Sequence, residues 1–271
     1  MKTSVIIPSK GCVYLKYLLR GLRNQIVKPY ELVLVLKSCN TKYIEHLCKE
    51  YDLPCVIVEQ VSGYFTHALN IGKKEARGDI LIFTDEDAIP MSKWIKKYVE
   101  LHTKYRDVAG ISSRDIFIDL QSLEVKPTPD DYAVVKLYRL FIRPWLEQPH
   151  PLFKKYRLGV YITKKFTVAH GPCIPDKVCY SLPFRGVNMS FKTSYLYDVW
   201  FPEHELLRRA PGNEQYFGLQ LALKEFETIY VPNNPVLHIV HQSLSRGSRD
   251  EIRKELEIMR ALYAELITKY S

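Results

Sequence analysis

Three consecutive acidic residues, Asp85, Glu86 and Asp87, are the side chains in this sequence best suited to chemistry. They follow an apolar run that ends at Phe83–Thr84, and Ile89–Pro90 comes shortly after them. Neighbouring carboxylates repel one another, and a bound cation relieves the repulsion. Alternate residues of an extended segment point the same way, so Asp85 and Asp87 can share one face. Their oxygen atoms suit Mg²⁺ or Mn²⁺, so this segment predicts a divalent-metal site.

A second interpretation places the three acids in a solvated turn before a helix near Met91, where negative charge stabilises the helix N-terminus. The apolar residues on both sides favour the metal site, because they put the acids at the end of a buried strand.

The elements that must position these acids alternate between apolar runs and segments with helical periodicity. Strands are expected at Ser4–Pro8, Leu32–Leu36, Cys55–Val58 and Asp79–Phe83, and helices at Tyr14–Gln25, Thr41–Tyr51, Phe65–Ala76 and Met91–Tyr105. This order predicts an α/β fold with a Rossmann-like, mostly parallel central sheet flanked by helices. Ligands of such sheets bind outside the carboxyl ends of the strands, where the three acids lie. The Gly-rich dinucleotide turn is absent after the first strand.

The remainder of the chain is less regular at first and then resumes the pattern. About residues 110–185 hold many prolines and a basic aromatic stretch. Further elements are expected as a strand at Arg185–Phe191, a helix near Glu214–Glu225, and strands at Ile229–Val231 and Val236–Val240. A last amphipathic helix is expected at Arg249–Tyr270, with one apolar face formed by Ile252, Leu256, Met259, Leu262, Tyr263, Leu266 and Ile267. We find no internal repeat and expect a single domain.

The composition is that of an ordinary globular protein, with 46% hydrophobic and 25% charged residues among 271. The net charge of +9 favours an anionic partner, such as a nucleotide, a nucleic acid, a phosphorylated substrate or a phospholipid surface. No apolar run approaches the roughly 18–20 residues that span a bilayer, and the first segment is too short for a signal peptide. We therefore expect a cytoplasmic protein, or one bound to the cytoplasmic membrane face without crossing it.

Six cysteines are present and none forms a C-x-x-C pair, which argues against a zinc site. They are Cys12, Cys39, Cys48, Cys55, Cys173 and Cys179. Most lie among apolar or helical neighbours, so we expect reduced thiols of an intracellular protein, with a disulfide as the alternative.

Four segments, in this order, resemble family 2 glycosyltransferases of the GT-A fold. They are SVIIPSKG, ALNIGKKEARGDILIFTDEDAIP, FRGVNMSFK and APGNEQYFGLQLALKEFETIYVPNNPVLHIVH. The resemblance covers roughly the first 100 residues and residues 184–241, while in residues 110–183 we identify no motif. It implies one GT-A domain with a nucleotide-sugar-binding half (1–105), an acceptor-side half (106–245) and a C-terminal helix (246–271).

The resemblance implies an inverting glycosyltransferase that moves a sugar from a nucleotide-diphosphate sugar to an acceptor hydroxyl of a glycan, lipid-linked or protein-linked acceptor. The family's Asp-x-Asp segment corresponds to Asp85–Asp87, so Asp85 and Asp87 would hold Mn²⁺ or Mg²⁺ and, with Glu86, the donor diphosphate. A late histidine of the family corresponds better to His238 than to His241 and would be a further metal ligand. A hydrogen-bonded strand histidine is the alternative for His238.

The family's catalytic carboxylate corresponds to Glu214 when the segments are aligned on Gly218–Leu219. Glu214 would take the proton from the acceptor hydroxyl, and one direct displacement implies inversion. The residues leave open that Glu214 only begins a helix after Gly212, where an acid is favourable. Glu203 and Glu205 are the other candidates for the base.

The resemblance also implies a donor site over the first two strands. Pro8, Ser9 and Lys10 would line the nucleotide, and Asn70, from the second matching segment, would also bind the donor. The family's acids after the second strand, which read the base or ribose, are replaced here by Leu36 and Lys37. This replacement leaves two alternatives. The donor is a nucleotide sugar with a base other than uracil, or backbone groups or Glu59 contact the base instead.

The basic aromatic stretch at residues 136–166 contains Trp145 among lysines and arginines. Such segments bind membrane surfaces by apolar insertion and attraction to anionic lipid. One hypothesis is that this stretch, with the C-terminal helix, contacts a membrane or a lipid-phosphate acceptor. A folded acceptor-side region with solvated lysines is the alternative.

Two other functions place similar demands on the sequence. A sugar-phosphate nucleotidyltransferase also holds Mg²⁺ with acids after a parallel strand, but it needs a Gly-rich basic loop after the first strand, and PSKGCVYLK is a poor version of one. A basic nucleic-acid-binding module does not need an ordered acidic cluster, so we expect no nucleic-acid partner.

Overall fold

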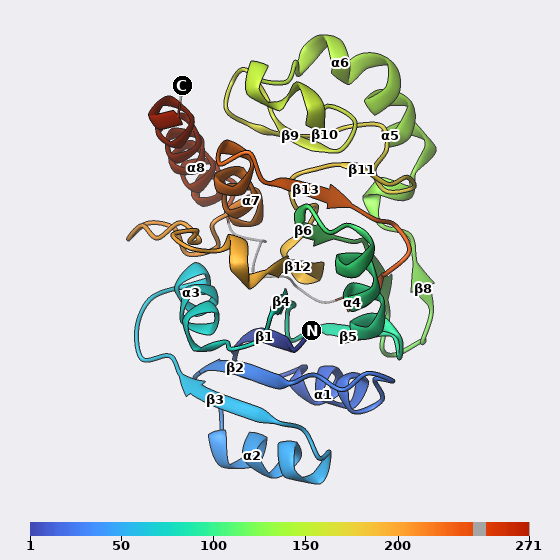
Figure 1. Ribbon diagram of the computed structural model, residues 1–271, viewed down its shortest axis with the longest axis vertical. Helices are drawn as coiled ribbons and strands as arrows, with labels where there is room; N and C mark the ends of the chain where they lie inside the picture. The colour runs from blue at the N-terminus through green and yellow to red at the C-terminus, as the bar shows by residue number, and fades with distance from the viewer. Residues whose placement is uncertain (241–247, 271) are drawn as a thin grey trace.

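A mixed eight-stranded sheet runs through the middle of the protein in the computed structural model, which describes residues 1–240 and 248–270 (Figure 1). The strand order is β11-β13-β6-β12-β4-β1-β2-β3. The strands are β1 (Thr3–Lys10), β2 (Glu31–Lys37), β3 (Cys55–Glu59), β4 (Ile80–Phe83), β6 (Val108–Ser112), β11 (Cys179–Tyr180), β12 (Met189–Lys192) and β13 (Glu227–Tyr230). β12 is antiparallel to both β4 and β6, and β11 is antiparallel to β13, while the other neighbours are parallel. The predicted mostly parallel sheet is therefore confirmed.

Helices cover both faces of this sheet, which explains why its strands are almost continuously apolar. They are α1 (Leu15–Arg23), α2 (Thr41–Glu50), α3 (Phe65–Glu75), α4 (Trp94–Lys104) and α7 (Asn213–Leu223). Alternate residues of β1 face opposite sides, so Val5 and Ile7 pack in the core of α1, α2 and α4, while Ile6 packs with α3 and α7. A Cβ on Gly72 would lie 2.3 Å from Ile6 Cγ2, so this glycine allows α3 to approach β1 closely.

A second, four-stranded sheet was not expected from the sequence. Its order is β5 (Ala88–Pro90), β14 (Val236–Ile239), β7 (Asp115–Ile118) and β8 (Val125–Lys126). β14 pairs in parallel with β7 and antiparallel with β5, and His238 stands opposite Ala88 and Phe117. The pairing brings a histidine from the end of the chain beside the residue that follows Asp87.

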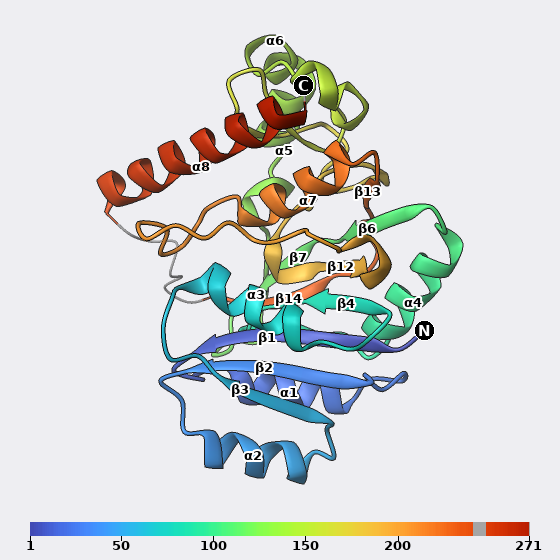
Figure 2. The same cartoon turned by 60° about the vertical axis from the view of Figure 1, so that its left-hand side comes forward.

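The stretch at residues 110–183 is more structured than the predicted irregular region. Its short elements are η1 (Pro129–Asp131), α5 (Ala133–Leu137), the π-helical turn η2 (Tyr138–Ile142), α6 (Arg143–Leu146), η3 (Pro151–Tyr156), β9 (Val160–Ile162) and β10 (Val168–His170). β9 and β10 form an antiparallel pair. These elements lie at the end of the molecule opposite α2 (Figures 1 and 2).

The last helix, α8 (Arg249–Tyr270), has the bounds that the sequence predicts. It packs on the core through Met259, Tyr263 and Ile267. Leu256, which was expected on the buried face, is 50% exposed, whereas the neighbouring Glu255 is buried and accepts hydrogen bonds from the 209–210 backbone. The prediction that Leu256 lies on the buried face was therefore wrong. Glu255 is buried in its place because its carboxylate accepts hydrogen bonds from the loop at residues 209–210.

Two further expectations were wrong. The strand expected at Arg185–Phe191 begins only at Met189, after the turn η4 (Gly186–Asn188), and a turn η5 (Thr193–Tyr195) follows it. The cysteines were expected as reduced thiols, but Cys12–Cys39 and Cys48–Cys55 form disulfides because β1, β2, α2 and β3 bring them together. None of the helices described has the length and apolar character to traverse a bilayer.

Asn188 is a fully buried hub that ties the two sheets together. Its side-chain oxygen accepts hydrogen bonds from Trp94 and Tyr98 on α4, and its amide donates to the carbonyls of Arg114 and Asn234. All four partners lose a hydrogen bond if the side chain is removed.

We expect Asn188→Ala to lower the free energy of unfolding by about 3 kcal/mol, because several buried polar groups would be left unsatisfied. Chemical denaturation followed by circular dichroism measures the change. Asn24→Ala, at an exposed helix end, is the matched control and should change the stability by less than about 0.5 kcal/mol. Equal stability of the two variants would contradict this role.

Candidate active site

The three acids lie where β4 leaves the large sheet and β5 enters the small one. They do not form an extended segment as expected: the Ala88 N–H donates to the Asp85 carbonyl at 3.2 Å, so the chain turns. Asp85 nevertheless lies within electrostatic range of Asp87, Glu86, His238 and Glu214. The structure thus brings together the predicted metal ligands and the predicted base, which the sequence separates by up to 153 positions.

A chain of alternating charges starts at Asp87 and runs into the protein. Asp87 Oδ2 lies 3.3 Å from His238 Nε2, and His238 Nδ1 lies 2.9 Å from Asp115 Oδ2. Asp115 is 1% exposed and accepts two hydrogen bonds from Arg185 Nη1, at 2.9 and 2.7 Å. The imidazole is therefore held at both nitrogens, which fixes its orientation towards Asp87.

The chain of charges continues into the middle segment of the sequence. Arg185 also forms a hydrogen-bonded ion pair with Asp130, and Arg139 forms a second one with the same carboxylate. Arg139 further donates to the Ile174 carbonyl and contacts His170 Nδ1 at 3.2 Å. We call Asp85, Glu86, Asp87 and His238 together the acidic corner. Buried charges are stable only when they are paired in this way, so these ion pairs connect η1 and η2 with the acidic corner.

These contacts set the protonation of the site. Burial, and next the charge of Asp87, raise the pKa of Asp85 to about 7. Burial alone would lower the pKa of His238, but the hydrogen bonds to Asp115 and Asp87 raise it to about 10. Burial alone would raise the pKa of Asp115, but the bond from His238 and the charge of Arg185 lower it. At neutral pH the corner therefore holds an imidazolium between two carboxylates.

Glu214 lies in the first turn of α7, on a loop that α8 holds in place. Ala210 and Gly212 have positive φ angles of 49° and 90°. The Glu255 carboxylate accepts the Ala210 N–H at 2.8 Å, and the Tyr263 hydroxyl donates to the Gly212 carbonyl at 2.6 Å. Burial raises the pKa of Glu214, and the Gly186 N–H and the charge of Arg185 act against that rise. The environment thus makes Glu214 more basic than an exposed glutamate.

The predicted donor-site residues lie along the carboxyl edge of the large sheet. Pro8 and Ser9 are buried in β1, with Lys10 exposed at its end, and the Ser9 hydroxyl donates to Glu86 Oε2 at 2.5 Å. Glu59 is exposed at the end of β3, in register with Leu36.

The loops at this edge are cross-linked. The Cys12–Cys39 disulfide joins the loops after β1 and β2, and the Gly11 N–H donates to the Lys37 carbonyl at 2.9 Å. Lys37 Nζ is bound to the Gly63 carbonyl at 2.6 Å, so its charge is held near the start of α3.

Asn70 forms its side-chain hydrogen bonds with Phe201 and Glu203 rather than with the predicted donor-site residues of β1, and Glu203 is one of the two alternative candidates for the base. The Asn70 side chain binds both backbone groups of Phe201 and donates to Glu203 Oε1 at 2.6 Å. Glu203 also contacts His67 at 3.0 Å, and Glu205 is exposed. Glu203 is thus held against α3 by Asn70 and His67. His241 lies outside the described residues.

Asp87 and His238 are the side chains best placed to hold a cation. Among residues 1–240 and 248–270, no three His, Cys, Asp or Glu side chains enclose an ion as they stand. The distance of 3.3 Å between Asp87 Oδ2 and His238 Nε2 is close to the roughly 3 Å between neighbouring ligand atoms on an octahedral ion with bonds of about 2.1 Å. The carboxylates of Asp87 and the adjacent Asp85 suit Mn²⁺ or Mg²⁺, and the His238 imidazole, oriented by Asp115, would be a nitrogen ligand beside them.

Asp115 and Arg185 were not among the residues predicted for the site. Arg185 lies in the segment FRGVNMSFK, but nothing there indicates its partners. Asp115 follows an apolar run that ends at Ser112, much as Asp85 follows β4, and this spacing was the available signal.

The fold is that of GT-A proteins. Solved structures with the same fold include TarS residues 1–349 of S. aureus in complex with UDP (TM-score 0.61, 16% identity, covering 98% of this chain and 65% of that one). A mannosyltransferase of Pyrobaculum calidifontis with GDP-Man and Mn²⁺ has a TM-score of 0.63 at 17% identity, over 97% of this chain and 64% of that one. GalNAc-T7 with UDP, GalNAc and Mn²⁺ has a TM-score of 0.64 at 15% identity, over 98% and 49%.

The model of glycosyl transferase family 2 matches residues 4–170, and the chain belongs to that family. An uncharacterized glycosyltransferase of Methanocaldococcus jannaschii is 26% identical over 155 residues, which are 53% of each chain. The chain thus spans about half the length of this curated relative and about two thirds of the TarS fragment.

We expect His238 to remain protonated through neutral pH in the metal-free protein and to lose its proton only near pH 10, because two carboxylates stabilise the imidazolium. Asp115→Asn should lower the pKa of His238. Titration of the imidazole resonances by NMR measures both. As a control, Asp119→Asn removes a partly exposed carboxylate that pairs with Lys126, and it should leave the pKa of His238 unchanged. A wild-type His238 that titrates near its ordinary value of 6.5 would refute this description.

Proposed function

We propose that this protein transfers a sugar from a nucleoside-diphosphate sugar to a hydroxyl group of an acceptor, with inversion at the anomeric carbon. The observation that carries the proposal is the position of Glu214 next to the Asp85–Asp87 and His238 corner at the carboxyl edge of the sheet. Family membership and the GT-A fold support the same reaction class.

The donor would lie over the ends of β1 and β2, with its diphosphate at the acidic corner. Asp87 and His238 would hold a Mn²⁺ or Mg²⁺ ion, with Asp85 next to them, and this ion would neutralise the negative charge of the leaving diphosphate. Mn²⁺ accompanies nucleotides in the structures of GalNAc-T7 and the P. calidifontis enzyme, which supports this arrangement. Because His238 carries a proton on Nε2 without the ion, binding of the ion should release a proton.

Glu214 would act as the general base on the acceptor side. Its raised pKa makes it a better proton acceptor than an exposed carboxylate. The acceptor oxygen would attack the anomeric carbon from the face opposite the leaving diphosphate while Glu214 takes its proton. Arg185 lies close enough to influence both Glu214 and Asp115, so it would hold the base in register with the corner.

The base of the donor would be recognised differently from the family pattern. Leu36 is buried and Lys37 is bound to a backbone carbonyl, so neither supplies a carboxylate to the ribose or base. Backbone groups of the disulfide-linked loops, or Glu59, would contact the ribose or base instead. The acceptor would be a glycan or a lipid-linked sugar.

We expect Asp87→Ala to weaken Mn²⁺-dependent binding of nucleoside diphosphates at least 100-fold, because it removes a metal ligand and the partner of His238. Isothermal titration calorimetry with UDP and GDP, with and without Mn²⁺, measures the effect. Asp79→Ala, at the opposite end of the same strand, is the control and should bind normally. Nucleotide binding of equal strength with and without Mn²⁺ would refute the metal-dependent donor site.

We expect Glu214→Gln to retain donor binding but to lower the transfer rate about 10²–10⁴-fold, because the amide cannot accept the proton. A screen of nucleotide sugars for metal-dependent turnover identifies the donor, and stopped assays then compare the variants. Glu203→Gln is the rival variant and should retain most of its activity. Normal transfer by Glu214→Gln would show that the base is another residue.

A further inference from the structure

In the helical segment from α5 to α6, charged side chains face the protein interior and apolar side chains face the solvent, which is the reverse of an ordinary surface helix. Arg139 points into the protein, where it is 5% exposed and bound to Asp130 and the Ile174 carbonyl. Arg143 is also tied down, by the His170 carbonyl at 2.9 Å and by Glu147 at 2.8 Å. Because the two arginines face inward, the apolar side chains between and around them face the solvent.

Exposed apolar side chains follow one another at helical spacing along α5, η2 and α6, and we call them the α5–α6 patch. Its main members, with exposed fractions of 52–81%, are Val134, Leu137, Leu140, Phe141, Trp145 and Leu146. None of the residues in α5 or α6 is buried. Isolated exposed apolar residues are normal, but a contiguous patch of this kind marks an interaction surface.

Positive charge is concentrated around the same patch. Residues 132–180 contain nine Lys or Arg and two Asp or Glu, so they supply seven of the nine net positive charges of the whole chain. Four of the nine are paired within the protein: Arg139 and Arg143 as described, Lys136 with Asp176, and Lys155 with Glu227. Lys154, Lys164, Lys165 and Lys177 are exposed, and Lys177 lies beside the patch.

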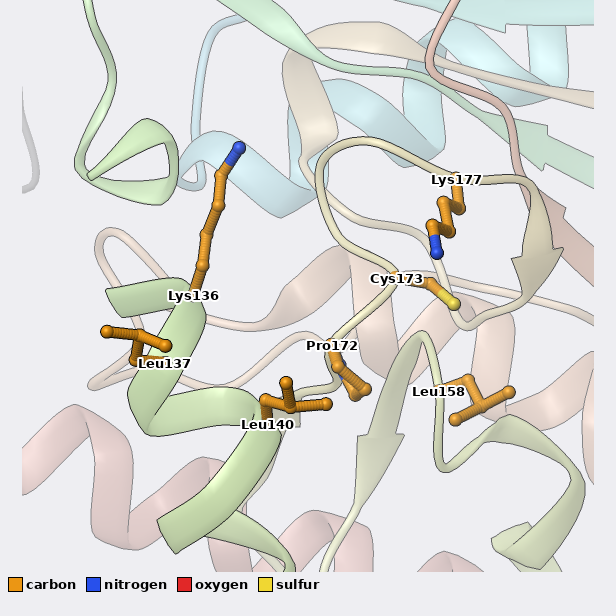
Figure 3. Close-up of a pocket in the computed structure, with 7 residues that line it drawn as sticks. All are labelled: Lys136, Leu137, Leu140, Leu158, Pro172, Cys173 and Lys177. Atoms are coloured by element: carbon orange, nitrogen blue, oxygen red, sulfur yellow. The ribbon is translucent and has the colours of Figure 1, made fainter. Parts of the chain in front are cut away.

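A cavity of about 380 Å³ opens between the patch and the loop before β11 (Figure 3). Leu137, Leu140 and Leu158 form its apolar wall together with Pro172, and Lys136 and Lys177 also line it. Lys177 thus lines the same small opening as the apolar wall, while the Lys136 ammonium pairs with Asp176. An apolar wall beside a lysine suits a lipid with an anionic headgroup.

We propose that the α5–α6 patch docks this protein onto an anionic membrane surface, with Trp145 and Phe141 inserted among the lipid headgroups and the lysines bound to lipid phosphates. Exposed aromatic and leucine side chains beside a basic rim are the features that bind a helix in the plane of a bilayer interface. A second copy of the chain fits less well, because a two-fold contact through this patch would bring two identical basic rims together.

The α5–α6 patch lies at the far end of the molecule from α2 (Figures 1 and 2). Arg139, on the inner side of this segment, is linked through Asp130 to Arg185. The patch itself contains none of the residues proposed for sugar transfer, so vesicle binding and donor binding can fail separately.

Sedimentation with vesicles tests the proposal. We expect the full chain to bind vesicles of phosphatidylcholine with phosphatidylglycerol, at least tenfold more strongly than pure phosphatidylcholine, and to dissociate as the salt concentration rises. In a Trp200→Phe background, the fluorescence of Trp145 should shift to the blue on binding, because the remaining Trp94 is fully buried. The double variants Trp145→Ser/Phe141→Ser and Lys136→Gln/Lys177→Gln should each lose at least tenfold in affinity.

Matched controls change the same residue types elsewhere. Tyr197→Ser removes an aromatic side chain that is 91% exposed, and Lys42→Gln/Lys49→Gln removes two exposed charges from α2. Both should bind vesicles like the unmodified chain, and circular dichroism should show all variants folded. Absence of binding to anionic vesicles, or equal loss in the controls, would overturn the proposal. So would a stable dimer in solution that Trp145→Ser/Phe141→Ser dissociates, because the patch would then be a self-interface.

Discussion

The buried carboxylate of Asp115 is the contact on which the proposed site depends. It lies between an imidazole and a guanidinium, is 1% exposed, and comes from a strand of the small sheet. An unpaired charge at such a position would be very costly, so His238 and Arg185 are required partners and not optional ones. Because the pairing of β7 with β14 sets where these residues meet, the small sheet determines the orientation of His238 towards Asp87.

Two later parts of the chain hold the opposite side of the same site. Arg185 reaches from the loop before β12 to Asp115 and Asp130, and its charge also acts on Glu214. α8 fixes the loop that starts α7, through the Glu255 carboxylate and the Tyr263 hydroxyl. His238 and the candidate base Glu214 are thus each oriented by hydrogen bonds and ion pairs from other segments, as preorganised sites require.

The middle segment connects this interior network with the surface. Asp130 is shared by Arg185 and Arg139, so the ion pairs that fix the site also turn the polar side of the α5–α6 helices inward. The remaining faces of these helices are apolar and meet the solvent among lysines. One network therefore explains both the orientation of His238 and the unusual surface at the far end of the protein.

The sequence by itself determined the α/β class, the parallel order of the first strands, the family, the acidic segment and the bounds of the last helix. Those features depend on local periodicity and on contiguous motifs such as GDILIFTDEDAIP, which survive in a single sequence. The roles predicted for Asp85, Asp87, Glu214 and His238 stay predictions, but their proximity could only be shown by the folded chain.

Only the tertiary structure decided which charged side chains pair with one another. Asp115, Asp130 and Arg185 come from separate segments, and no local pattern indicates that these three charged groups meet inside the protein. The same reason explains the four cysteines that were expected to be reduced, the buried Glu255 and the exposed Leu256. In each case the environment of the side chain is set by residues distant in sequence, and burial, charge pairing and disulfide geometry depend on that environment.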